Sequence, residues 1–117
     1  MIQTVASPFA LQFSRTGGSL ITARLDVWQP TPTGWQSVGQ FAFSDPTHSV
    51  ENVPGQLAPG SYTCVFQCYV EESLNGKYSF DFSVAGSSVY QDSGDVNTTS
   101  ANNDSKVYKD QFVLKVT

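Results

Sequence analysis

The residues that could perform nucleophilic chemistry in this chain are its one histidine, His48, and its two cysteines, Cys64 and Cys68. A nucleophile needs a base within hydrogen-bond reach and an open approach for the substrate. His48 follows Asp45 and Pro46 in a predicted turn, whereas Cys64 is predicted to face the core. The sequence contains no Gly-rich phosphate loop, no Gly-x-Ser-x-Gly turn and no His-Glu-x-x-His motif. We therefore expect no enzyme, and a small hydrolase using His48 ranks last among the hypotheses.

The spacing of Cys64 and Cys68 argues against a disulfide between them. Four residues apart on an extended strand, their Cα atoms would be roughly 13 Å apart, about twice the separation that a disulfide spans. A metal site is disfavoured because Cys-x-x-x-Cys comes with a single histidine. We expect two buried free thiols. Together with an N-terminus that lacks the pattern of a signal peptide, they favour a cytoplasmic chain, or one exported without such a signal.

Two tryptophans flank a Pro-rich segment and could serve binding. Trp28 and Trp35 bracket Gln29–Gly34, which is predicted to be a loop because proline removes donors from a strand ladder. Aromatic rings stack on sugars and are enriched at protein contacts. Strand alternation places Trp28 outside and Trp35 on the core side, so Trp28 is the better contact residue.

A second candidate surface is the outward face of the strand that carries the cysteines. Val65, Gln67 and Tyr69 point outward there and, with Val38 and Ala42 of another strand, form a modest apolar patch. A patch of this kind suits a protein partner or a second copy of the chain.

The polar segment 92–106 is predicted to be a long loop with oxygen donors of the type that Ca²⁺ prefers. The candidate ligands are Asp92, Asp95, Asn97, Asn103 and Asp104. Their spacing does not match a known calcium loop, and such residues are also common in loops because they favour turns. A Ca²⁺ site and a purely structural loop both remain open.

These candidate residues must be positioned by strands, because apolar residues alternate with polar ones along most of the chain. The predicted strands are residues 9–14, 20–28, 35–43, 48–53, 62–71, 77–84, 88–91 and 107–116. Each has one apolar face, which must be buried against a second sheet. The short turns between them favour antiparallel pairing. We predict one all-β domain over residues 1–117, an antiparallel two-sheet β-sandwich of seven to eight strands.

One segment resembles immunoglobulin-like and fibronectin-III-like sandwiches. In residues 56–64, QLAPGSYTC, a leucine precedes a Pro-Gly turn, and Tyr62 stands two residues before Cys64. The resemblance implies a tyrosine corner, in which the Tyr62 hydroxyl bonds to the backbone just upstream. No cysteine precedes Cys64, so the inter-sheet disulfide of antibody domains is missing. The resemblance concerns architecture, since folds of this kind host many functions.

Composition narrows the function further. The chain has 15 Ser, 10 Thr, 9 Gln and 5 Asn, but only 14% charged residues, against about 25% in a typical domain. Six Lys and Arg against ten Asp and Glu give a net charge of -4, which disfavours nucleic-acid binding. No apolar run is long enough to span a membrane.

Removing water from an uncharged polar surface costs less free energy than removing it from a charged surface. We predict a non-catalytic interaction or structural module that forms oligomers or joins a larger assembly. The alternative is a lectin-like carbohydrate-binding domain, with Ca²⁺ as its only candidate cofactor.

Overall fold

The computed structural model describes residues 1–17, 20–45, 48–71, 77–95, 98–99, 102–103 and 105–117. Within these ranges the regular structure consists of strands: β1 (Ile2–Val5), β2 (Phe9–Gly17), β3 (Leu20–Thr31), β4 (Gly34–Phe43), β5 (Val50–Gly55), β6 (Gly60–Glu71), β7 (Lys77–Val84), β8 (Ser87–Asp95), β9 (Thr98–Thr99), β10 (Asn102–Asn103) and β11 (Ser105–Val116). No helix in the described part of the chain is long and apolar enough to cross a membrane.

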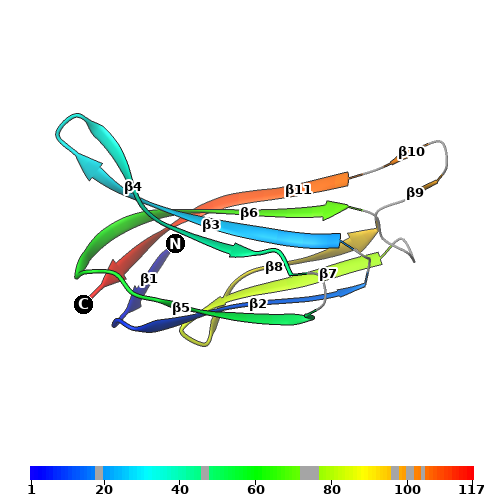
Figure 1. Cartoon of the computed structure of the whole chain (residues 1–117), viewed down its shortest axis with the longest axis horizontal. Helices are drawn as coiled ribbons and strands as arrows, with labels where there is room; N and C mark the ends of the chain where they lie inside the picture. Colours follow the sequence, from blue (N-terminus) through cyan, green and yellow to red (C-terminus); the bar gives the residue numbers. More distant parts are fainter. Residues whose placement is uncertain (18–19, 46–47, 72–76, 96–97, 100–101, 104) are drawn as a thin grey trace.

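The strands form two layers that lie face to face (Figure 1). One sheet has five strands in the order β1-β11-β6-β3-β4, and the other has four in the order β5-β2-β7-β8. The predicted two-sheet β-sandwich is confirmed. All neighbours within the two sheets pair antiparallel except β1 and β11, which pair in parallel over Ile2–Val5.

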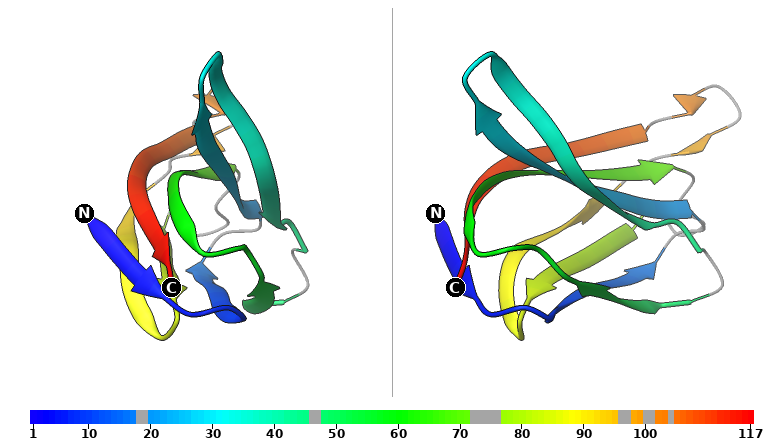
Figure 2. Two further views of the ribbon diagram at one scale, coloured as in Figure 1. Left: turned by 90° about the vertical axis from the view of Figure 1, so that its left-hand side faces the viewer. Right: turned by 60° about the vertical axis from the view of Figure 1, so that its left-hand side comes forward.

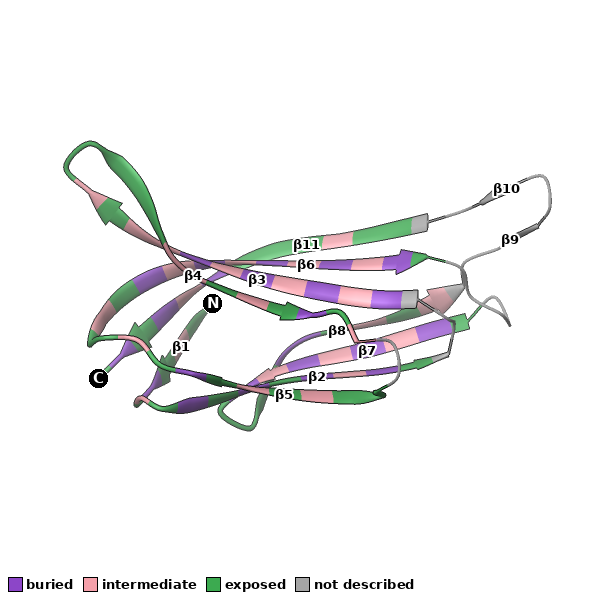
Figure 3. Cartoon of the chain, viewed as in Figure 1, coloured by how far each residue is buried: buried purple, intermediate pink, exposed green. Residues whose placement is uncertain are grey.

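The core lies between the two layers and follows the alternation of the sequence (Figure 3). Along β6, every second residue from Tyr62 to Val70 is buried, and the residues between them are partly exposed. Both cysteines are buried and unpaired, as predicted. Phe66 occupies the centre of an aromatic cluster, stacked on Phe82 at 4.6 Å and on Tyr90 at 5.3 Å between ring centroids. Contacts of this kind add to the hydrophobic gain of burying the rings.

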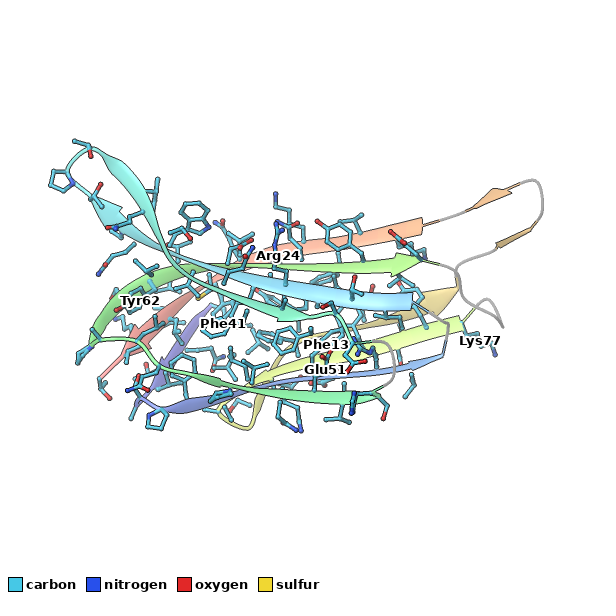
Figure 4. The ribbon with its side chains drawn as sticks, in the orientation of Figure 1. Phe13, Arg24, Phe41, Glu51, Tyr62 and Lys77 are labelled. Carbon is cyan, nitrogen blue, oxygen red and sulfur yellow. The ribbon has the colours of Figure 1, made fainter. Side chains whose placement is uncertain are left out.

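The tyrosine corner expected from the resemblance is present. The Tyr62 hydroxyl donates a hydrogen bond of 2.6 Å to the carbonyl oxygen of Ala58, four residues upstream. The bond fixes the turn that leads into β6, and Tyr62 itself is buried and points into the core (Figure 4).

Among the described residues, Arg15 is the one charged residue that is buried. It lies between the sheets with 7% of its surface exposed. From β2 of the four-stranded sheet it donates to the carbonyl oxygens of Ile21 at 2.8 Å and Phe43 at 3.2 Å, both in the five-stranded sheet. It also forms an ion pair with Glu51 of β5 at 2.8 Å. Arg15 continues the series Phe9, Leu11 and Phe13, in which every second residue faces inward. The alternation of the sequence therefore indicates that Arg15 faces inward as well.

The predicted loop at Gln29–Gly34 is wrong for most of its length. β3 continues through Pro30 to Thr31, and β4 begins at Gly34, so only Pro32 and Thr33 connect the two strands. Pairing between β3 and β6 ends at Trp28. Beyond that point β3 has a neighbour on one side only, a position at which a sheet tolerates proline.

The predicted loop at residues 92–106 is also corrected. The register of β7 and β8 continues to Lys77 opposite Asp95, so Asp92–Asp95 belong to a strand. β11 already begins at Ser105, and β9 and β10 pair as a short ladder between them. Polar residues can form these strand ends because strands pair through backbone hydrogen bonds, which do not depend on an apolar side-chain face.

Candidate binding groove

The end of the β3–β4 hairpin projects beyond the body of the sandwich. We call residues 28–37 the arm; Figures 1 and 2 show it extending past the other strands. Its two strands pair with each other from Trp28 opposite Ser37 to Thr31 opposite Gly34. The arm is therefore a two-stranded ribbon continuous with the five-stranded sheet.

A β-bulge at Val38 directs the arm. Gly39 pairs with Val27 and Ser37 pairs with Trp28, which leaves Val38 as the extra residue of β4. A bulge bends a strand and reverses its alternation of faces. Val38 accordingly packs against the core, so its predicted place in the outer apolar patch is wrong.

The same bulge overturns the prediction for Trp35. Strict alternation counted back from Phe43 and Phe41 places Trp35 on the core side. The extra residue in β4 moves Trp35 to the opposite face. Trp35 is 62% exposed, opposite Pro30 on the arm. The structure thus brings the two tryptophans to one surface, which the sequence did not predict.

Trp28 and Trp35 line a groove of about 490 Å³ between the arm and the outer face of the five-stranded sheet. The other lining residues are Thr63 and Val65 of β6 and Gln111 of β11. None of these five side chains is charged. The groove combines two indole rings, one aliphatic side chain, one hydroxyl and one amide, a set suited to binding uncharged surfaces.

A charged pair lies next to the groove, on the same outer face, where Figure 4 labels Arg24. Asp26, opposite Val65, accepts a hydrogen bond of 3.1 Å from Arg24 Nε and one of 3.0 Å from Gln40 Nε2. The carboxylate is therefore matched by donors from β3 and β4. A carboxylate paired in this way can lie beside a contact surface without being dehydrated as an unpaired charge.

Tyr69, the third predicted contact residue, is separate from the tryptophans. It lies on the same outer face, as do Val65 and Gln67, because Cys68 and Val70 on either side of it are buried. Trp28 pairs with Thr63, whereas Tyr69 pairs with Thr22. Six residues of extended strand separate Thr63 from Tyr69, roughly 20 Å. Tyr69 donates a hydrogen bond to the side chain of Gln67 and is not part of the groove.

The outer face of the four-stranded sheet carries a different groove, of about 460 Å³. We call it the hydroxyl groove; its lining includes Ser14, Thr16, Ser79, Asp81, Gln91 and Ser93. Polar groups on this face bond to one another. Thr16 and Ser79 share a hydrogen bond, and the Asp81 carboxylate accepts from Ser83 at 3.0 Å and Ser88 at 2.9 Å.

The candidate calcium ligands are only partly described. Asn97 and Asp104 lie outside the described residues, and the side chains of Asp95 and Asn103 are not described. Asp92 accepts a hydrogen bond of 3.0 Å from the Tyr78 hydroxyl. Among the residues with described side chains, no group of three His, Cys, Asp or Glu is placed to hold a metal ion. The calcium site stays a prediction.

The candidate nucleophile and base differ in environment. Burial raises the pKa of Cys64 and of Cys68 to about 12, so both thiols are protonated at neutral pH. His48 is exposed on the segment between β4 and β5, where its Nδ1 pairs with Asp45 at 2.8 Å. A protonated, buried thiol is a poor nucleophile.

Sequence reasoning missed Thr63 and Gln111 as groove residues. Alternation places both on outer faces, but only the pairing of β6 with both β3 and β11 brings them beside Trp28. Comparisons of the chain with protein-family models, with curated proteins and with solved structures gave no match.

Proposed function

We propose that this protein is a non-catalytic interaction or structural module that contacts its partner through the tryptophan groove. The observation that carries the proposal is Trp35, 62% exposed beside Trp28 in a groove without charged lining residues. Covering an indole ring gains roughly 25 cal/mol for each Å² removed from water. Tryptophan is also enriched among the residues that dominate protein contacts.

We further propose an immunoglobulin-like module in the broad sense of that architecture. The tyrosine corner at Tyr62 makes β6 the counterpart of strand F of immunoglobulin domains. Its neighbours β3 and β11 then correspond to strands C and G, and this order supports the assignment. β7 and β8 differ from the antibody arrangement. They follow β6 in the chain but join the opposite sheet beside β2, whereas in antibody domains the strand after F pairs with F. Shared architecture with a different strand order is common among sandwiches.

Binding of a neutral carbohydrate is the second candidate function. It is favoured by Thr63 and Gln111, whose hydroxyl and amide line the groove together with the rings. Sugars present an apolar face to an aromatic ring and hydroxyls to polar side chains. The groove contains both kinds of group within one cavity.

Tryptophan fluorescence tests the proposal, because both tryptophans of the chain line the groove. Emission and acrylamide quenching would be followed while the concentration of the chain is raised. In a second series, neutral oligosaccharides would be added at fixed protein concentration, with Ca²⁺ or with EDTA. Trp28→Phe and Trp35→Phe would assign the signal to each ring.

A second copy of the chain as the partner predicts a blue shift and weaker quenching as the chain concentration rises, mostly from Trp35. A response to sugar alone would favour the carbohydrate function instead. If emission and quenching stay constant in both series, the groove binds neither, and the proposed function is wrong.

A further inference from the structure

The edge strands of the two sheets differ in how they are protected. An edge strand exposes unpaired N–H and C=O groups, and proteins usually protect it with charges, prolines, bulges or short length. Within the described chain, the edges are β1 and β4 of one sheet and β5 and β8 of the other. β1 has only four residues, β5 contains Glu51 and Pro54, and β8 contains Asp92 and Asp95.

β4 lacks most of this protection. Its ten residues, GWQSVGQFAF, include no charged residue and no proline. Its terminal carbonyls have side-chain partners, since Thr31 donates to Gly34 and Arg15 donates to Phe43. Between these ends, β4 is the last strand of its sheet, paired with β3 alone. The bulge at Val38 is its single protective feature.

We propose that the free edge of β4 pairs antiparallel with β4 of a second copy, which joins two five-stranded sheets into one. The inference rests on the proposed function, since it names the partner of that module. An antiparallel pair about a two-fold axis presents the same surface on both copies. One uncovered strand therefore supplies both halves of the interface.

The charge distribution permits a second copy at this edge. The chain carries a net charge of -4, so two copies repel each other on average. Their β4 edges add no like-charge contact to this repulsion because the strand is uncharged. A partner with a strongly charged strand would have to dehydrate its charges against Trp35, Val38 and Phe41.

The shape of the molecule permits the pairing. The arm, which contains the first part of β4, projects away from the body, so that an approaching strand meets little else (Figure 2). Trp35 lies on β4 itself and is exposed. Side chains of directly paired residues on neighbouring strands lie about 5 Å apart, so a paired strand would cover part of its ring.

Sedimentation velocity of the full chain over a range of concentrations tests the pairing. The variant Gln36→Lys/Gln40→Lys adds two positive charges to the β4 edge, as natural edge strands do. The substitution Gln40→Lys keeps a donor for the carboxylate of Asp26, which protects the fold. The matched control, Gln12→Lys/Gln91→Lys, makes the same change on the outer face of the four-stranded sheet, where both glutamines are exposed.

We expect a dimer for the wild type and for the control, and at least a tenfold weaker association for the β4 variant, which corresponds to about 1.4 kcal/mol. Amide exchange within residues 35–42 should slow as the dimer forms. A wild type that stays monomeric at millimolar concentration would overturn the proposal. So would a dimer that the β4 charges leave unchanged.

The result separates this inference from the proposed function. Emission of Trp28, measured in Trp35→Phe, separates the two because Trp28 lines the groove but lies on β3, away from the edge. A dimer that depends on β4 while Trp28 emission stays constant would retain the edge pairing and reject the groove as the contact surface. A concentration-dependent shift of Trp28 emission in a chain whose association ignores the β4 charges would do the reverse.

Discussion

The two outer faces of the sandwich carry grooves of similar volume but opposite chemistry. The tryptophan groove, about 490 Å³, is lined by two indole rings and three other uncharged side chains. The hydroxyl groove, about 460 Å³, lies on a face whose polar side chains bond among themselves, with Asp81 accepting from both Ser83 and Ser88. Volume alone therefore does not distinguish a binding surface from an ordinary sheet face.

The difference lies in the cost of covering each face. Hydroxyls and a carboxylate must exchange existing hydrogen bonds and water for new partners, so the net gain is small. An exposed indole ring, when a partner covers it, loses only unfavourable contact with water. We infer that contact occurs on the five-stranded side and that the hydroxyl face supports the fold and remains hydrated.

The largest expected effect comes from separating the two sheets that hold these faces. Arg15→Met removes the guanidinium that joins β2 to the carbonyls of Ile21 and Phe43 and leaves Glu51 without its ion-pair partner. Removal of one member of a buried pair costs about 3–5 kcal/mol of unfolding free energy. Urea denaturation followed by circular dichroism measures this loss.

The matched control for Arg15 is Arg24→Met, which removes the same charge from the outer face. Arg24 is substantially exposed, and its pair with Asp26 should contribute at most about 1 kcal/mol. Equal losses for the two variants would contradict the role of Arg15 as the link between the sheets.

Alkaline pH should weaken the core beneath both faces. Burial raises the pKa of Cys64 and Cys68 from 9.0 to about 12, so the unfolded chain loses these protons first. Stability is therefore full below pH 9 and falls as the pH rises from 9 toward 12. Buried Tyr90, whose pKa burial also raises, adds to the same trend.

Urea midpoints measured across this pH range test the alkaline effect. The variant Cys64→Ala/Cys68→Ala should show a shallower decline than the wild type, whatever its stability at neutral pH. An unchanged slope would mean that the thiols ionise as readily in the folded chain as in the unfolded one.

A pair of single substitutions should give opposite results on the two faces. Asp81→Ala leaves the hydroxyls of Ser83 and Ser88 without their acceptor and should cost about 1 kcal/mol of stability, with no change in association. Trp35→Ala, at an exposed site, should change stability by roughly 0.5 kcal/mol or less but weaken the association of the chain. Denaturation and sedimentation on both variants provide the comparison, and a reversed pattern would contradict it.

Much of the fold could be predicted from alternation, because each strand must bury one apolar face. The inward residues of β2, β6 and β7 follow this rule without interruption. The rule failed at Trp35, where one extra residue in β4 reversed the phase. A bulge depends on pairing with another strand, and a single sequence does not show that pairing.

The site was partly predictable for the same reason. Trp28 and Tyr69 were placed on the correct face, but their separation along the sheet required the register of β3 with β6. Arg15 was missed because charge suggests exposure, although its position in the alternation indicates burial. Its carbonyl partners come from distant strands that only the folded chain brings together.

The most direct test of a binding surface on the five-stranded side uses a photo-crosslinking amino acid placed once on each face. Benzoyl-phenylalanine would replace Trp35 in one variant and Gln91, which lines the hydroxyl groove, in the other. Irradiation of the purified chain should give crosslinked dimers from position 35 and only monomer from position 91. Dimers from position 91 alone, or equal yields from both positions, would contradict a contact surface in the tryptophan groove.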